Sequence, residues 1–322
     1  MLLLLVASCK DPKPDDGKEA EKKDSTAAII SDTVAIVNTD NPIADEKCII
    51  RFNPTIGTTY TLTNSTNYTM LQELDTAKMK VGSNQYSKVS MKFLSKTDTL
   101  YKVEFTIKDL RKSMKGDSVS REYKYGIPDP DPQADMDRKI DDCMVNTPIT
   151  VYMNEQGEGV DIDGYEAIVK KVSAVVGKDV PDQAVASQLG MPTDNIENYF
   201  VIFPDTAIHI GSTWTYSVNS MMDGVPILLH NKYTITDRKD GVIYVKMHTN
   251  VDIDRKLIPK EYLDEMVNLK FSASITANYE VDEKTGWPVY VKLNQFMEVS
   301  DVYQGHNTHS KNTSSGEFRL LQ

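Results

Sequence analysis

The sequence predicts a mainly β protein of the α+β class, with antiparallel, curved sheets made of two similar halves and a short helical segment between them. Three observations predict this fold. Apolar and polar residues alternate with a period of two in several stretches, turns containing glycine separate these stretches, and one motif occurs twice. The 322 residues are enough to bury a sizeable core without a metal or a disulfide framework.

The repeated motif is a glycine turn followed by a strand. It reads IGTTYT at residues 56–61 and IGSTWT at residues 210–215. After the first turn Tyr60 and Leu62 share one side of the chain, and after the second turn Trp214 and Tyr216 do the same. This alternation of aromatic or aliphatic with polar residues predicts two half-buried strands in corresponding positions.

Later elements of the two halves also correspond. Alternating residues predict strands at 101–107 and 243–249, each after a charged turn. Further alternation leads into glycine-containing turns at 154–157 and 282–286, which predict hairpins between antiparallel strands. The pattern therefore favours a diverged internal duplication, although strand-rich chains share turn chemistry in any case.

Helices are expected between the halves. Residues 165–176 carry apolar side chains at helical spacing, with Asp163 and Glu166 as a capping box and Gly177 at the end. A second short helix can begin at Pro181, and an apolar stripe continues from Ile196 to Phe203. These stripes either pack on a sheet or cover an apolar ligand cavity, whose lining would be Ile168, Val172, Tyr199 and Phe200.

The N-terminus carries a localisation signal. The apolar run that ends in Val6, Ala7, Ser8 and Cys9 resembles the lipobox of bacterial lipoproteins. This resemblance implies a signal peptide at residues 1–8, which lacks the usual basic residues and is short, and acylation of Cys9. Several acyl chains hold a protein to a membrane far more firmly than one chain does.

A charged, proline-containing segment follows Cys9. Residues 9–44 therefore read as a lipidated cysteine with a flexible tether. The β half at 45–163, a helical connector at 164–204 and a second β half at 205–322 complete the expected organisation. Ser25 and Thr33 each follow an aspartate and precede a Thr or Val, which resembles the O-glycosylation acceptor of Bacteroidota, and Lys10-Asp11 resembles the surface-export tag of that phylum.

Composition excludes several classes of function. The net charge of −11 repels phosphate backbones, which argues against nucleic-acid binding. No phosphate loop, dinucleotide fingerprint, nucleophile elbow or zinc-protease motif occurs, so we expect no enzyme activity, no metal and no cofactor. His306 and His309 lie in a stretch rich in Gly, Asn and Ser that reads as a surface loop, and the aspartates of 129–137 read as an exposed acidic loop rather than a calcium site.

Two other groups of residues permit chemistry without requiring it. The carboxylates of Glu155, Glu158, Asp161 and Asp163 cluster around a predicted hairpin, but nothing in the sequence indicates a cleft. Cys48 and Cys143 either form a disulfide, which an oxidising envelope permits, or remain two buried thiols.

The order of these features resembles one family. The string Phe203-Pro204-Asp205 followed by Gly211 and Trp214, together with the glycine turns already described, is similar to the Bacteroidota envelope lipoproteins with domain of unknown function 6263. The resemblance covers the chain from about Ile49 onward. It implies an anchored, β-rich envelope protein and supplies no activity or catalytic residues.

The sequence thus predicts a non-enzymatic binding or interaction module, lipid-anchored to the outer membrane and either periplasmic or surface-exposed. Its partners would be the membrane, through the anchor, and an unknown envelope protein or apolar ligand. The alternative is a carrier of lipid or lipoprotein with an apolar cavity under its helices.

Overall fold

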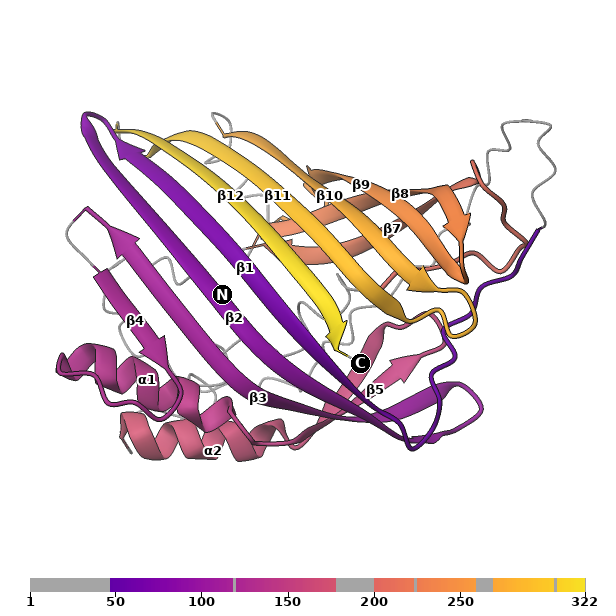
Figure 1. Ribbon diagram of the computed structural model, residues 1–322. Helices are drawn as coiled ribbons and strands as arrows, with labels where there is room; N and C mark the ends of the chain where they lie inside the picture. Colours follow the sequence, from indigo (N-terminus) through magenta and orange to yellow (C-terminus); the bar gives the residue numbers. More distant parts are fainter. Residues whose placement is uncertain are drawn as a thin grey trace, which may run out of the picture.

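The computed structural model describes residues 47–117, 120–177, 200–222, 225–258, 269–303 and 306–321. These residues form twelve strands in one sheet and two helices (Figure 1). In chain order the elements are β1 (Thr59–Leu74), β2 (Ala77–Lys96), β3 (Leu100–Gly116), β4 (Ser120–Lys124), α1 (Pro132–Met144), β5 (Ile149–Asn154), β6 (Gly159–Asp163), α2 (Tyr165–Val176), β7 (Thr213–Met222), β8 (Val225–Lys239), β9 (Val242–Ile253), β10 (Lys270–Asp282), β11 (Pro288–Tyr303) and β12 (His306–Leu321).

All strands belong to a single curved sheet, and neighbouring strands run antiparallel. The order across the sheet is β6-β5-β3-β2-β1-β12-β11-β10-β9-β8-β7, with β4 paired to β3. The first and last strands therefore pair at the centre, and the sheet is unclosed because β6 and β7 end the order at opposite edges. Figure 1 shows the two halves curling toward each other on either side of β1 and β12. The predicted fold class is confirmed, with one continuous sheet.

The repeated glycine motif begins both halves with the same backbone contacts. The amide of Gly57 donates to the carbonyl oxygen of Phe93 at 2.8 Å, and the amide of Gly211 donates to that of Ile235 at 2.9 Å. The register between β2 and β3 shifts directly after Phe93, and the register between β8 and β9 shifts directly after Ile235. The two halves thus share the glycine turn, the hydrogen bond that it makes to the neighbouring strand and the register shift beside it, as expected for two similar halves.

The core gathers at one end of the sheet around Trp287. Its ring lies 4.2 Å from that of Tyr60 and 5.7 Å from that of Phe52, centroid to centroid, and both pairs are stacked. Phe93 and Phe200 meet the same indole edge-on at 5.5 and 5.4 Å. We call this end of the strands the core end. The other, where β1 turns into β2 and β11 approaches β12, is the open end.

A crossing segment closes the core end. Cys48 pairs with Ile208 as an isolated bridge, and the guanidinium of Arg51 donates to the carbonyl oxygen of Pro204 at 3.1 Å. Gly286 lies directly against this segment with φ +64°, and a Cβ atom there would be 2.5 Å from the Arg51 carbonyl oxygen. Only glycine permits this close approach of two backbones.

Helix α2 confirms the predicted residues 165–176, but its start differs from the prediction. Gly164, in the left-handed region, is the N-cap residue, and no side chain caps the helix. The proposed capping box is wrong because Asp163 ends β6 and accepts a hydrogen bond from the Tyr152 hydroxyl at 2.8 Å.

Helix α1 replaces part of the predicted acidic loop. Pro132 stands at the start of the helix, where a missing amide costs nothing, and the Asp131 carboxylate caps it by accepting from the amides of Gln133 and Ala134. This helix lies inside the first half of the chain, between β4 and β5, and not in the connector.

Two further expectations were wrong. Residues 200–204, the described end of the expected apolar stripe, are not helical, although Phe200 and Val201 are buried. The stretch after residue 306, expected as a surface loop, is β12, the last strand of the chain and a central strand of the sheet. The expected helix from Pro181 lies outside the described residues.

Candidate functional site

The two faces of the sheet have different chemistry. Side chains alternate along each strand, so every second residue shares a face with the core. On β1 the core face carries Leu62 and Met70, which are buried, and the other face carries Thr63, Ser65 and Asn67. The register extends this division across neighbouring strands. We call the core face the inner face and the other the outer face.

The outer face is hydrophilic over most of its length. The residues that follow this parity on β9, β10 and β12 are mainly lysine, serine, threonine, asparagine and glutamate: Lys246, His248, Asn250, Ser272, Ser274, Thr276, Asn278, Thr313, Ser315 and Glu317. A face of this composition is suited to contact with water, whereas the inner face has to be covered or occupied.

At the core end the protein itself covers the inner face. The expected cavity-lining residues Ile168 and Val172 lie on α2 and pack into the hydrophobic core, as does Phe200. Tyr199, the fourth of that set, lies outside the described residues. The structure therefore places Ile168, Val172 and Phe200 in the packed core.

Toward the open end, apolar side chains continue on the inner face beyond the core, with polar side chains between them. Strands β1 and β12 have 16 residues each and reach about 50 Å, so they extend well past the aromatic cluster. We define the inner apolar patch as the following side chains of the inner face near the open end: Met70, Met79, Val81, Val218, Ile227, Leu229, Val251, Ile253, Phe271, Ala273, Met297 and Val299.

Most of the inner apolar patch is only partly buried. Met70, Ile227 and Val251 are buried, Met79 is 44% exposed, and the other members are intermediate. The patch extends over eight adjacent strands, from β2 to β7, which at about 4.8 Å a strand is roughly 34 Å. It is interrupted at β12, whose inner-face residues at this level are Ser310, Asn312 and Ser314. Figure 1 shows α1 and α2 at the edge of the sheet opposite β7, beside β3, β4 and β5.

Polar residues interrupt the inner face between the core and the patch. The Thr249 hydroxyl donates to Asn231 Oδ1 at 2.6 Å, and the Ser314 hydroxyl donates to Gln295 Oε1 at 2.9 Å. These groups satisfy one another across adjacent strands, so they form a polar band that needs no water.

A separate cavity of about 310 Å³ opens on the outer face at the open end. His309 stands beside it, with Nε2 2.9 Å from a carboxylate oxygen of Glu298 and Nδ1 3.5 Å from one of Glu73. Its lining is Glu73, Asp75, Lys270, Ser300, Asp301, Val302, Asn307, Thr308 and His309. Since both imidazole nitrogens already have carboxylate partners, the geometry favours a structural cross-link between β1, β12 and β11.

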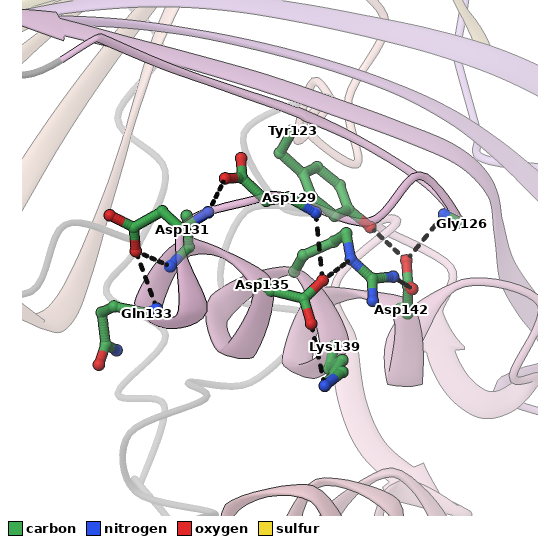
Figure 2. Close-up of polar contacts among 10 residues, drawn as sticks. Tyr123, Gly126, Asp129, Asp131, Gln133, Asp135, Lys139 and Asp142 are labelled. Carbon is green, nitrogen blue, oxygen red and sulfur yellow. Dashed lines mark hydrogen bonds and ion pairs between the residues drawn. The ribbon is translucent and has the colours of Figure 1, made fainter.

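The acidic residues around α1 form a network with basic partners (Figure 2). Lys139 and Arg138 bind the carboxylate of Asp135 and hold its pKa well below the usual range. Arg138 also pairs with Asp142, which accepts a hydrogen bond from the Tyr123 hydroxyl at 2.9 Å. These contacts therefore fasten α1 to β4 and give the carboxylates of Asp135 and Asp142 basic or hydroxyl partners.

Burial shifts the pKa values of two groups beside this helix, Asp141 and Tyr123. It raises the pKa of Asp141, against the opposing effect of Lys112, whose ammonium lies 2.6 Å away. It also raises the pKa of the Tyr123 phenol, with the Asp142 carboxylate acting in the same direction. Lys112 belongs to the inner face, so α1 covers that face beside β3.

The carboxylates near the predicted hairpin have separate partners. Glu155 pairs with Lys96 at 2.7 Å, Glu158 accepts from Asn154, and Asp163 accepts from Tyr152. Within the described ranges, no group of three or more His, Cys, Asp or Glu side chains is arranged to hold a metal ion.

Of the two alternatives for Cys48 and Cys143, the structure has two free thiols and no disulfide. The Cys48 thiol faces the carbonyl oxygen of Ile208 at 3.7 Å, and the Cys143 thiol faces that of Lys139 at 3.1 Å within α1. Each thiol therefore faces a backbone carbonyl oxygen and not the other thiol. Cys9, Ser25 and Thr33 lie outside the described residues. No helix among those described is both long and apolar enough to span a membrane.

Comparison with known proteins gives one family and distant similarities. The model of a family of unknown function (DUF6263) matches residues 98–288, more than half of the chain. None of the curated proteins matches the sequence.

Solved structures resemble the chain only weakly. A structure titled for lipid–protein interactions in lipovitellin is 12% identical with a TM-score of 0.48, over 83% of this chain and 25% of that one, so this chain spans a quarter of its length. OpdQ of Pseudomonas aeruginosa is 6% identical with a TM-score of 0.24, over 82% and 99% of the two chains. At these scores the similarities carry no argument about function.

Proposed function

Because this chain belongs to the family of unknown function DUF6263, we propose its function from the geometry of the sheet: a non-enzymatic binding module of the cell envelope that holds the acyl chain of a lipid against the inner apolar patch. The observation that carries the proposal is the contrast between the faces. The outer face is polar, whereas the inner face carries the packed core and, beyond a band of polar residues, the inner apolar patch.

Three properties favour an acyl chain over a protein partner. The inner apolar patch is long and lies on the face whose core-end residues from both halves meet in one core, where a chain of methylenes fits better than a folded surface. Met70, Met79 and Met297 contribute flexible, unbranched side chains, which adapt to ligands of irregular shape. Each buried methylene contributes about 0.8 kcal/mol, so a long chain supplies ample affinity.

The charge of the chain narrows the class of lipid. The net charge of −11 disfavours anionic head groups. The patch itself consists of uncharged residues, and Lys112, on the inner face of β3, is paired with Asp141. We therefore expect neutral or zwitterionic lipids rather than anionic ones.

Localisation is part of the same proposal. The lipobox-like run that ends in Cys9 and the charged tether after it support a protein that is lipid-anchored to the outer membrane, on its periplasmic side or exposed at the surface. In such a place a lipid-binding surface would have its ligand within reach of the tether.

The anchor is checked by the Cys9→Ser variant. We expect the wild-type chain to sediment with the membrane fraction and to incorporate radiolabelled palmitate. Cys9→Ser should move to the supernatant and lose the label, because its residue 9 offers no thiol for acylation. A variant that still sediments with membranes and carries the label contradicts the anchor, but it leaves the role of the sheet open.

Lipid binding is tested on full-length Cys9→Ser protein, so that the acyl groups of the chain itself cannot compete. We expect native mass spectrometry to detect neutral or zwitterionic lipid bound without a covalent bond. We also expect saturable fluorescence enhancement of N-phenyl-1-naphthylamine, with displacement by long-chain but not short-chain fatty amides. Protein that is folded by circular dichroism, free of lipid and without saturable binding of the dye would refute the proposed function.

A further inference from the structure

On the inner face, between strands that contribute to the inner apolar patch, the buried side-chain oxygen of Asn312 has no hydrogen-bond donor among the described residues. Asn312 lies on β12, directly opposite Met70 of β1 and Met297 of β11. Its side chain is 93% buried, since only 7% of the residue is exposed. Within the described part of the chain, Oδ1 of Asn312 accepts no hydrogen bond.

Two polar pairs of the inner face nearer the core are hydrogen-bonded, unlike Oδ1 of Asn312. The band between patch and core consists of hydrogen-bonded pairs, Thr249 with Asn231 and Ser314 with Gln295. A buried acceptor without a donor is unfavourable, and a leucine or valine of similar size would avoid this penalty. An oxygen in this position therefore points to a donor that the protein itself does not supply.

The surroundings define what this donor must be. It has to reach an oxygen that lies between Met70 and Met297, with Ser310 and Ser314 next along the same face of β12, so it must belong to a molecule with both an apolar and a polar part. The two methionines that flank Asn312 are flexible and can move aside to admit it. A neutral N–H or O–H group beside a long acyl chain meets these conditions, whereas a charged group would lose its hydration.

We propose that Asn312 recognises the hydrogen-bond donor of a neutral amphipathic lipid, an amide N–H or a hydroxyl adjacent to the acyl chain, when the chain lies along the inner apolar patch. This inference rests on the proposed function and deepens it, because it names the polar group of the ligand. The patch supplies affinity for the chain, and Asn312 supplies the selection between lipids with and without a donor.

Two probes with the same acyl chain and carbonyl, one with amide N–H groups and one with N-methyl groups in their place, test the inference. Palmitamide carries amide N–H groups, and N,N-dimethylpalmitamide keeps the chain and the carbonyl but has no N–H. Both are titrated against N-phenyl-1-naphthylamine bound to full-length Cys9→Ser protein. We expect palmitamide to bind about tenfold more tightly, as one additional satisfied hydrogen bond in a dry site permits.

Variants then assign the difference to one side chain. Asn312→Leu should bind both probes with equal affinity, and its melting temperature should not fall, because the substitution removes an unsatisfied acceptor. The matched control is Asn294→Leu on β11, an exposed position of the outer face. This variant should keep the preference for palmitamide.

Every result supports or overturns the inference. Equal binding of both probes by the unsubstituted protein overturns it while leaving the proposed function in place, and this comparison needs no variant. A preference that survives in Asn312→Leu also overturns it, as does folded Asn312→Leu protein that binds neither probe. Failure of both probes to bind the unsubstituted protein refutes the proposed function itself.

Discussion

Replacing Trp287 by alanine should cost about 3–5 kcal/mol of the free energy of unfolding, the usual range for a fully buried large aromatic side chain. The indole, from the second half, is 1% exposed and contacts the rings of Phe52, Tyr60 and Phe93 from the first half and of Phe200 from the segment between the halves. Its loss leaves a cavity where the two halves meet. Chemical denaturation followed by far-ultraviolet circular dichroism measures the change.

Two further variants separate packing from other effects. Trp287→Phe should cost much less, because it keeps a ring in the cluster and removes Nε1, an indole donor without a partner among the described residues. Tyr125→Ala, at a position that is 43% exposed, is the control for loss of an aromatic side chain and should stay within about 0.5 kcal/mol of the wild type. Equal costs for Trp287→Ala and Tyr125→Ala would contradict the central place of Trp287 in the core.

The strands at the core end could be predicted because their side chains alternate without interruption. Tyr101, Val103 and Phe105 on β3 and Ile243, Val245 and Met247 on β9 face the core, and the residues between them face outward. The period of two is strong where one face is fully buried. The glycine turns were equally visible, because Gly57 and Gly211 have positive φ angles that favour glycine.

Other elements could not be predicted, since long-range pairing determines them. Strand β12 contains Asn307, Thr308, Ser310, Asn312 and Ser314, residue types that favour loops when considered alone. It forms a strand because β1 and β11 bond to it on both sides and its outer face meets water. Tertiary context outweighs local preference here.

Helix α1 was missed for a local reason. The residues before and at its start are rich in aspartate and proline, a composition that is typical of loops. The aspartate before Pro132 is nevertheless a good N-cap, and the proline is compatible with the first turn. The aspartate directly before a proline is thus the sequence signal from which this helix could have been predicted.

The candidate site shows the same division between local and long-range information. The helical residues Ile168 and Val172 were visible as an apolar stripe, and they belong to the core. The inner apolar patch was not visible, because its members come from strands that are adjacent only in the folded sheet. Met70 and Met297 are separated by most of the chain and face Asn312 from either side.

A charge in the inner apolar patch should abolish most of the lipid binding. We expect Met297→Asp to weaken the affinity for N-phenyl-1-naphthylamine and palmitamide about 30-fold or more, because an acyl chain that covers the carboxylate removes its hydration and offers no counter-charge. The adjacent residue Phe296 lies on the outer face of the same strand, with Lys311 5.5 Å from its ring centroid.

Phe296→Asp is therefore a closely matched control for Met297→Asp, with the same new residue one position away. Its carboxylate would face water and Lys311, so binding should stay within about twofold of the unsubstituted protein. If both variants lose binding equally, the charge acts through the strand as a whole and not through the inner face. If neither loses it, the ligand lies elsewhere. Only a loss confined to Met297→Asp places the acyl chain on the inner side of the sheet, because the two positions share everything except the direction of the side chain.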